Sequence, residues 1–557
     1  MKSKMHFPLN NSSLYKTPKF KKTLLVSSLN YDFKSKQDRE EIVDNFGRFL
    51  NSLNFPIQVL CQSKIINSSD WELKNIDENY SSFLRELIDS KNTTEKKFYV
   101  SFVGKGEEEL QVKKTTIEKG LKRCGLYAEE VEVEEPSYSA ELSPNWFYVD
   151  GLYHQTLYVE NWPHSAVGGW LSDLYNIDKN LSISMFLHPV DNNLALPYIK
   201  KRIVRTQSNV NISSEFSDYY GDYDEDIMTA LSMRDEIVKN EGKFFFMTFY
   251  ITVKSNDLGQ LKRDVDFIRG YLSGMMIVAH KAFLRQDEGF KCTLPNGVDY
   301  LKDISSYTFT TTPLKRFFPF ISANVVDEGG IFIGENLLNQ SLIFLNHFNY
   351  LTSSMVVLGK SGSGKSYAVK SQVMKLVKND VEVTVLDIED EFSKLPKSKN
   401  LIIKKFNSIA EYREFIVLYW EEVKRDPNKP RFLVIDEFWE FMRDEEIAKL
   451  VQEIVKKCRK RWLGICVITQ EVEDLLNNEC GKSIINNTSI KMLLKVESNQ
   501  RDVISKVFGL TPSEFSFLVG ASEGEGILFA GTNHVQFKTI VSRQLHKEIT
   551  TKPEELH

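Results

Sequence analysis

The chain has 557 residues, of which 42% are hydrophobic and 26% charged, a composition that fits a folded protein and excludes a disordered or collagen-like chain. Single cores stop growing at roughly 250 to 300 residues, so we expect two or three domains. The formal net charge of −5, from 71 Lys and Arg against 76 Asp and Glu, gives no overall electrostatic reason to expect nucleic-acid binding, and DNA contact would need a local basic patch.

The six cysteines are scattered, with no CxxC pair and no histidine at the spacing of a zinc site. No run of 18 or more apolar residues is present, and the polar, basic N-terminus lacks the apolar core of a signal sequence. We therefore expect a reduced cytoplasmic protein without its own membrane span. Peripheral attachment to the inner face of the cell membrane stays open.

The first half of the chain alternates apolar, β-rich runs with amphipathic stretches such as residues 258–282. This alternation predicts an α+β region. Clusters of Gly, Pro, Asn and Thr between residues 284 and 320 indicate a boundary near residue 320. We therefore expect an N-terminal α+β domain over residues 1–320, with division into two subdomains left open, and a second domain over 321–557.

Beyond residue 320, short apolar strands alternate with helix-like segments. Runs rich in Val, Ile and Leu between helices predict an α/β domain with a mostly parallel sheet that is covered on both faces. The predicted strands are MVVLG (355–359), EVTVLDIE (382–389), RFLVIDE (431–437), GICVITQ (464–470) and IKMLLKV (490–496).

The stretch GKSGSGKS, residues 359–366, follows an apolar strand and precedes a predicted helix over 366–378. It matches the phosphate-binding pattern G-x-x-x-x-G-K-S/T in the strand–loop–helix context that this chemistry needs. Its glycines allow a tight turn that aims N–H groups at phosphate oxygens, and the helix N-terminus adds partial positive charge. A glycine-rich turn that matches by chance is the alternative. The predicted ATP-binding residues are Gly359, Lys360, Ser361, Gly362, Ser363, Gly364, Lys365, Ser366 and Tyr367.

Within this loop, Lys365 is expected to reach the β- and γ-phosphates and Ser366 to ligate Mg²⁺. The strand RFLVIDE ends in two carboxylates, the form of a Walker B motif. Asp436 would hold the Mg²⁺ through water, and Glu437 would polarise the attacking water as general base. Solvated residues at a strand end are the alternative for this pair. Together the two motifs predict an enzyme that hydrolyses ATP with Mg²⁺.

The strand GICVITQ ends in Gln470, which could contact the γ-phosphate or water. A P-loop strand, an intervening strand, a Walker B strand and a polar-tipped strand in this order are typical of the additional-strand, catalytic-glutamate class of NTPases, so a RecA-like domain is expected. The intervening strand leads to a group of carboxylates that includes Glu391, at the edge where α/β sheets bind ligands. An acidic turn is the alternative for this group.

The densest basic cluster is KKCRKRW, residues 456–462. Either Arg459 or Arg461 could act as an arginine finger on the ATP of a neighbouring subunit. The cluster could instead contact DNA phosphates, or it could be a solvated helix face. The sequence leaves these three readings open.

Residues 315–545 resemble the TraC-like conjugation ATPases of type IV secretion systems, within the HerA–FtsK superfamily. The resemblance rests on a Pro-Phe pair at Pro319 and Phe320, a G-x-x-x-G turn at Gly330 and Gly334, and the segments DIEDEF, VIDEFW and GEGILFAG. Over the first 310 residues it rests mainly on architecture. Relatives carry a sizeable helical insertion before Walker B, whereas residues 392–430 leave room for one short strand and one helix, which weakens any expectation of partner or DNA contacts there.

The resemblance implies a motor, usually hexameric, that powers pilus assembly or substrate transport, with an N-terminal domain that docks to inner-membrane channel proteins. The family roles pass to Lys365, Ser366, Asp436, Glu437, Gln470 and Glu391 by position in the motifs. A HerA-like or FtsK-like DNA translocase is the first alternative. A scaffold that binds nucleotide without hydrolysing it is the second, and the presence of Glu437 argues against it.

Overall fold

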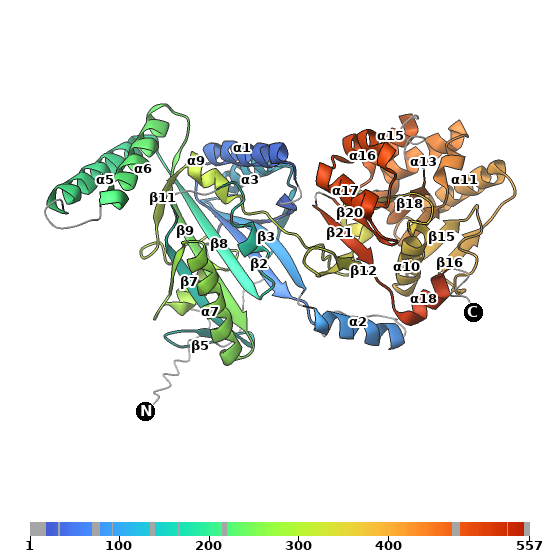
Figure 1. Cartoon of the computed structure of the whole chain (residues 1–557), viewed down its shortest axis with the longest axis horizontal. Coiled ribbons are helices and arrows are strands. Elements are labelled where there is room, and N and C mark those ends of the chain that lie inside the picture. Colours follow the sequence, from blue (N-terminus) through green and yellow to red (C-terminus); the bar gives the residue numbers. More distant parts are fainter. Residues whose placement is uncertain are drawn as a thin grey trace. The chain divides into compact units, whose positions relative to one another are not determined.

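A computed structural model of the chain describes residues 18–31, 34–68, 78–91, 93–133, 140–163, 167–213, 220–470, 479–531 and 533–550, without the side chains of residues 205–226 and 459. The chain divides into two compact units (Figure 1). The first comprises residues 1–64 and 96–321, and the second comprises residues 65–95 and 322–557. The predicted boundary near residue 320 lies next to this division, but the sequence assigned residues 65–95 to the first domain.

The first unit is built on a large sheet with the strand order β4-β1-β3-β2-β8-β9-β7-β6-β5, in which β10 also pairs with β7 and β11 with β9. Strand β9 is almost wholly buried and runs antiparallel between β8 and β7. The strands are β1 (Lys21–Val26), β2 (Ile57–Ile65), β3 (Thr94–Val103), β4 (Ala128–Val131), β5 (Glu141–Leu142), β6 (Phe147–Val149), β7 (Leu152–Asn161), β8 (Leu181–Val190), β9 (Phe244–Ser255), β10 (Val278–Lys281) and β11 (Tyr307–Thr310).

Helices α1 and α3 pack against each other, α7 packs on β7 and β9, and α5 and α6 form a hairpin (Figure 1). The predicted amphipathic stretch over 258–282 is only partly helical, because the helix ends at Gly274 and residues 278–281 form a strand. The helices are α1 (Lys36–Ser52), α3 (Glu107–Arg123), α4 (Ser172–Tyr175), α5 (Asn192–Ser213), α6 (Tyr220–Val238), α7 (Leu258–Gly274), α8 (Gln286–Cys292) and α9 (Thr311–Leu314).

The second unit contains a sheet with the strand order β13-β12-β21-β20-β19-β14-β18-β17-β15-β16. The strands from β19 to β16 in this order are parallel, which agrees with the predicted parallel sheet. The other four extend one edge as antiparallel strands, which the sequence did not predict. The strands are β12 (Ile331–Asn336), β13 (Leu342–Leu345), β14 (Ser354–Leu358), β15 (Glu382–Leu386), β16 (Leu401–Lys404), β17 (Arg431–Ile435), β18 (Leu463–Thr469), β19 (Ile490–Leu494), β20 (Glu525–Ala530) and β21 (Asn533–Thr539).

The parallel strands are covered by helices on both faces. Along β14, Val356 and Leu358 belong to one hydrophobic core, while Met355 and Val357 belong to the other. Alternation of this kind explains the continuous apolar runs in the sequence, since both faces of the central strands β14, β17 and β18 are buried. In the described part of the chain, no helix is long and apolar enough to cross a bilayer. The helices are α10 (Lys365–Lys378), α11 (Ile409–Arg425), α12 (Phe438–Phe441), α13 (Glu445–Lys457), α15 (Glu479–Asn487), α16 (Arg501–Phe508), α17 (Pro512–Gly520) and α18 (Arg543–Ile549).

Residues 65–95 add a helix, α2 (Glu78–Ser90), to the second unit. The buried face of α2 includes Leu84 and Ile88, which share a core cluster with Phe332 and Phe344 of β12 and β13. The Thr93 hydroxyl accepts a hydrogen bond of 2.8 Å from the backbone N–H of residue 342. This segment is therefore part of the packing of the C-terminal unit, although it lies more than 200 residues away in the sequence.

Candidate functional site

The ends of the central parallel strands bring the predicted motifs to one edge of the second sheet. Leu358, the last residue of β14, pairs in register with Thr469 of β18, and Ile435 of β17 pairs with Val467. Because neighbouring parallel strands end at the same edge, the residues that follow them lie close together. The segments that meet there are the loop 359–364, the pair Asp436 and Glu437, and Gln470.

The loop after β14 is fixed by its own backbone and by two neighbouring segments. The N–H of Lys360 donates a 2.8 Å hydrogen bond to the carbonyl oxygen of Lys495, which follows β19. On the other side, the N–H of Gly524 donates to the carbonyl oxygen of Ser363 at 3.0 Å. These bonds hold the loop in shape before any ligand binds.

Two glycines give the loop its turn. Gly362 and Gly364 have φ angles of 71° and 92°, in the region that residues with a Cβ rarely adopt. Helix α10 begins directly after Gly364, so its unpaired N–H groups and its dipole face the loop. Free N–H groups and partial positive charge together make a site for an anion such as a phosphate group.

Lys365, the first residue of α10, is buried at the mouth of this loop. Its Nζ donates a 3.1 Å hydrogen bond to the carbonyl oxygen of Lys360. Burial lowers the pKa of Lys365, while the carboxylates of Glu437 and Asp436 act in the opposite direction. The side chain therefore places a cation beside the loop and the Walker B carboxylates. A phosphate oxygen would replace the carbonyl oxygen as its partner.

Asp436 is 2% exposed and stands among other carboxylates. Burial, together with the negative charges of Glu391, Glu437 and Asp387, raises the pKa of Asp436 to about 8. The negative charges in this group of carboxylates repel one another, and a bound cation would relieve that repulsion. Hard divalent cations bind to carboxylate oxygens. The chemistry therefore fits Mg²⁺ at Asp436. Ser366, the second predicted ligand, lies partly buried in the first turn of α10.

Glu437 has an unusual backbone conformation and two hydrogen-bond donors on its carboxylate. Its φ and ψ angles are 43° and 53°, the left-handed region, which is uncommon for a residue with a side chain. The Nε2 of Gln470 donates to Oε1 at 2.6 Å, and the Nε1 of Trp439 donates to Oε2 at 2.7 Å. Gln470 thus contacts the predicted base itself. Sequence reasoning missed Trp439, although the Trp stands in the quoted segment VIDEFW.

Glu391 lies beside a buried lysine that sequence reasoning also missed. Its backbone N–H donates to Oδ1 of Asp387 at 3.0 Å, and its carboxylate lies 3.9 Å from the Nζ of Lys370. Lys370 is 2% exposed. Burial lowers its pKa, while the negative charges of Glu391, Asp387 and Asp436 act in the opposite direction. The available signal was a lysine without other charged residues beside it in the stretch SYAVKSQVM of the predicted helix.

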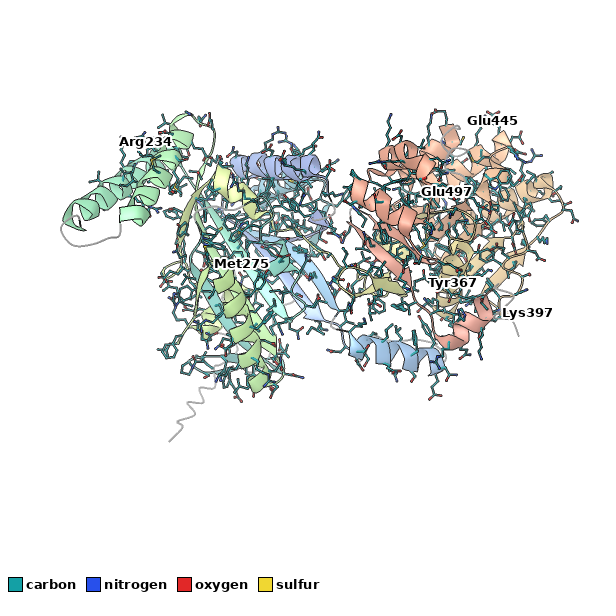
Figure 2. All side chains as sticks on the ribbon, in the orientation of Figure 1. Arg234, Met275, Tyr367, Lys397, Glu445 and Glu497 are labelled. Carbon is teal, nitrogen blue, oxygen red and sulfur yellow. The ribbon has the colours of Figure 1, made fainter. Side chains whose placement is uncertain are left out.

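The remaining predicted binding residues differ in their surroundings. Tyr367, labelled in Figure 2, places its hydroxyl 2.8 Å from the Nδ1 of His546 on α18, so its side chain packs on the C-terminal helix. Lys360 forms an ion pair of 2.8 Å with Glu497, which Figure 2 also labels. Ser361 is exposed at the tip of the loop.

The structure does not bring Arg461 to the site of its own chain. Arg461 lies two residues before β18, and Leu463 pairs with Arg431 at the amino end of β17. The loop 359–364 follows the carboxyl end of β14 and therefore lies at the opposite edge of the parallel sheet. The guanidinium of Arg461 donates to the carbonyl oxygen of Lys457 and lies 5.1 Å from the ring centre of Trp420. The side chain of Arg459 lies outside the description.

One family model matches part of this unit. Residues 415–526 match the TraG P-loop domain. The matched segment contains Asp436, Glu437 and Gln470 but begins after the loop 359–366. A search of curated proteins found no match to the chain.

Several solved structures are similar to the chain. VirB4 of Thermoanaerobacter pseudethanolicus is 16% identical, with a TM-score of 0.37 over 40% of this chain and 99% of that one. The pCW3 conjugation coupling protein TcpA is 17% identical, with a TM-score of 0.30 over 39% and 67%. The genome-packaging NTPase B204 of Sulfolobus turreted icosahedral virus 2 is 16% identical, with a TM-score of 0.30 over 35% and 100%. The TraG match confirms the predicted resemblance to conjugation and type IV secretion ATPases, since residues 415–526 are similar to the TraG P-loop domain.

Proposed function

We propose that the chain is the ATP-hydrolysing motor of a conjugation or type IV secretion system. The observation that carries the proposal is the position of Glu437. This residue follows β17, and only β18 separates β17 from β14, the strand that leads into the loop 359–364. Its carboxylate accepts a hydrogen bond from Gln470. A carboxylate in this place can act as a general base toward a water molecule beside the terminal phosphate.

Each side chain of the site has a task in this proposal. The loop N–H groups and the N-terminus of α10 bind the phosphates, and Lys365 exchanges its carbonyl partner for a phosphate oxygen. Ser366 and Asp436 would hold Mg²⁺, which supplies neutralisation of phosphate charge when bound. Glu437 takes a proton from water as that water attacks the γ-phosphorus, and ADP leaves. Electrostatic placement rather than covalent chemistry supplies most of the rate in such reactions.

The strand order supports assignment to the additional-strand, catalytic-glutamate class with a RecA-like core. Strand β18 lies between β14, which precedes the loop, and β17, which precedes Asp436. The polar residue at the tip of β18 is therefore next to both motifs. This is the arrangement that the class requires for a residue that senses the reacting groups.

Assembly and partners follow from the family resemblance. We propose a hexamer at the cytoplasmic face of the membrane, docked to channel proteins through the first unit, with pilus assembly or substrate transport as its output. The place of Arg461 at the amino end of β18 supports a role toward a neighbouring subunit, because this residue is remote from its own loop. Arg459 is the other candidate for that role.

The test compares ATP binding and hydrolysis by the purified chain, two site variants and two control variants. Lys365→Ala should lose both, since the phosphate charge is then unmatched. Glu437→Gln should bind ATP normally but hydrolyse it at least about 100-fold more slowly. The controls are Lys449→Ala and Glu445→Gln, which remove one exposed ion pair on α13.

The proposal fails if Lys365→Ala behaves like the parent or if the purified oligomer shows no ATPase activity. A nucleotide-binding scaffold would show normal binding and equal single-turnover rates for the parent and Glu437→Gln. Hydrolysis that duplex DNA stimulates in a salt-sensitive manner would favour the DNA translocase instead, because phosphate contacts release counterions.

A further inference from the structure

Trp439 is the second donor to the proposed base, and no motif assigns it a task. It lies in the short helix α12, two residues after Glu437, and its ring is partly buried. Its Nε1–H donates to Oε2 of Glu437 at 2.7 Å, while Gln470 donates to Oε1 at 2.6 Å. The two oxygens of one carboxylate therefore receive one donor each.

Two donors on different oxygens fix the rotation of a carboxylate as well as its position. The indole N–H can only donate, so this bond has a single polarity. Each carboxylate oxygen offers two lone pairs, so one remains on each oxygen to accept a proton from water. Neither the indole donor nor the amide donor carries a charge.

The backbone alone does not hold Glu437 in place. Its left-handed φ of 43° costs free energy and persists only where the surroundings enforce it. The hydrogen bond from Trp439 and that from Gln470 are two such restraints. They come from different elements, α12 and the end of β18.

The indole of Trp439 is itself held by Arg443. The guanidinium carbon of Arg443 lies 4.4 Å from the ring centre of Trp439, and the same guanidinium donates to Oε2 of Glu440 at 3.1 Å. A cation over the face of an indole is a favourable contact. Arg443 thus keeps the ring in the plane from which its N–H reaches Glu437.

We propose that Trp439 is a positioning residue for the hydrolytic step, which holds the carboxylate of Glu437 by Oε2 while Gln470 holds Oε1. This inference rests on the proposed function, since it assigns Trp439 to the base of that reaction. Trp439 lies on α12 and not in the loop 359–364 that would bind the phosphates. Its loss should therefore slow the chemical step without weakening ATP binding.

The kinetic test uses Trp439→Phe, which keeps an aromatic face for Arg443 and removes the N–H donor together with one ring of the indole. We expect kcat to fall by about tenfold or more while KM and the affinity for a fluorescent ATP analogue stay within about twofold, the signature of an interaction made in the transition state. Trp146→Phe, a partly buried Trp of the first unit, is the matched control and should keep the parent kcat. A raised KM with unchanged kcat, or a parent-like kcat, overturns the inference.

A second measurement needs no hydrolysis and separates this inference from the proposed function. In a ¹⁵N–¹H spectrum of the indole groups of the full chain, which has seven Trp residues, the Trp439 resonance is assigned by its loss in Trp439→Phe. Glu437→Ala should shift that resonance and leave the Trp146 resonance in place. An unshifted Trp439 resonance overturns the positioning role of Trp439 even if ATPase activity is present. A shifted resonance in a chain without ATPase activity overturns the hydrolytic proposal instead.

Discussion

The backbone N–H of Gly524 donates a 3.0 Å hydrogen bond to the carbonyl oxygen of Ser363, so the turn before β20 is bonded directly to the phosphate-binding loop. This approach leaves no space for a side chain on the neighbouring glycine. A Cβ on Gly364 would lie 2.9 Å from the nitrogen of Gly524, closer than real Cβ contacts allow. The shape of the loop thus depends on a segment about 160 residues further along the chain.

The first prediction concerns Gly364→Ala. The Cβ would clash with Gly524, and the φ of 92° is strained for alanine by roughly 1–2 kcal/mol. We expect the affinity for an ATP analogue to fall by at least about tenfold, which is about 1.4 kcal/mol of binding free energy. The matched control is Gly509→Ala, where φ is 64° and no atom lies within 4 Å of the added Cβ. Equal affinities of the two variants would contradict the prediction.

The second prediction concerns Lys370, the buried cation beside the carboxylate of Glu391. Lys370→Met removes the positive charge that lies 3.9 Å from Glu391 and leaves three carboxylates without it. Because Lys370 is buried while the Glu391 side chain is 35% exposed, the cost should lie below the roughly 3–5 kcal/mol of a fully buried ion pair. We expect a loss of this order in urea unfolding, and addition of Mg²⁺ should restore part of it. Lys449→Met, at an exposed ion pair, is the control and should unfold like the parent.

The central part of the second unit follows from local sequence. The central parallel strands are mostly apolar because both of their faces are buried, as Met355 and Val356 show on β14. The loop after that strand needs glycine for backbone reasons that act within eight residues. Periodicity and turn chemistry therefore suffice to predict these elements and to place Lys365, Asp436 and Glu437 at one edge.

The contacts that complete the site depend on long-range or conformational details. Trp439 reaches Glu437 only because Glu437 adopts a left-handed conformation, which the letters DEFW do not reveal. Lys370 becomes a partner of Glu391 only when β15 and α10 are placed side by side. Segment 65–95 joins the second unit by packing on β12 and β13, and no local pattern indicates that partner. Sequence reasoning therefore located the motifs and missed the side chains that support them.

The third prediction tests the contribution of that segment. Leu84 of α2 is 2% exposed and packs in a cluster with Phe332, Leu342 and Phe344. Leu84→Ala should lower the free energy of unfolding of the second unit by about 2–5 kcal/mol. Loss of bound ATP analogue at rising urea concentration follows this unit specifically. Arg85→Ala, an exposed residue of the same helix, is the control. Equal urea midpoints for the two variants would show that α2 is dispensable for the unit.

The last prediction concerns pH and Asp327, which lies outside the ATP site. The pKa of Asp327 is raised to about 6, mainly by burial and also by the charge of Glu95, although hydrogen bonds from the N–H of Asn346 and the hydroxyl of Tyr350 act in the opposite direction. Both donors contact Oδ2, at 2.8 Å each. Asparagine can present its amide oxygen in that place and keep both bonds. Asp327→Asn therefore removes the charge and retains the acceptor.

The sign follows from proton binding. Between pH 4 and pH 6 the folded chain keeps a proton on Asp327 that the unfolded chain has lost, so this residue makes the parent less stable as pH rises through that window. At pH 7.5, Asp327→Asn should be more stable than the parent by at most about 3 kcal/mol, from about 1.36 kcal/mol per pKa unit. The difference should vanish near pH 4. Urea unfolding of both proteins across this range measures it, with Asp502→Asn, an exposed carboxylate of α16, as the control. A stability difference that stays constant from pH 4 to pH 7.5 would show that Asp327 is charged throughout, and its burial would then be compensated by the two hydrogen bonds alone.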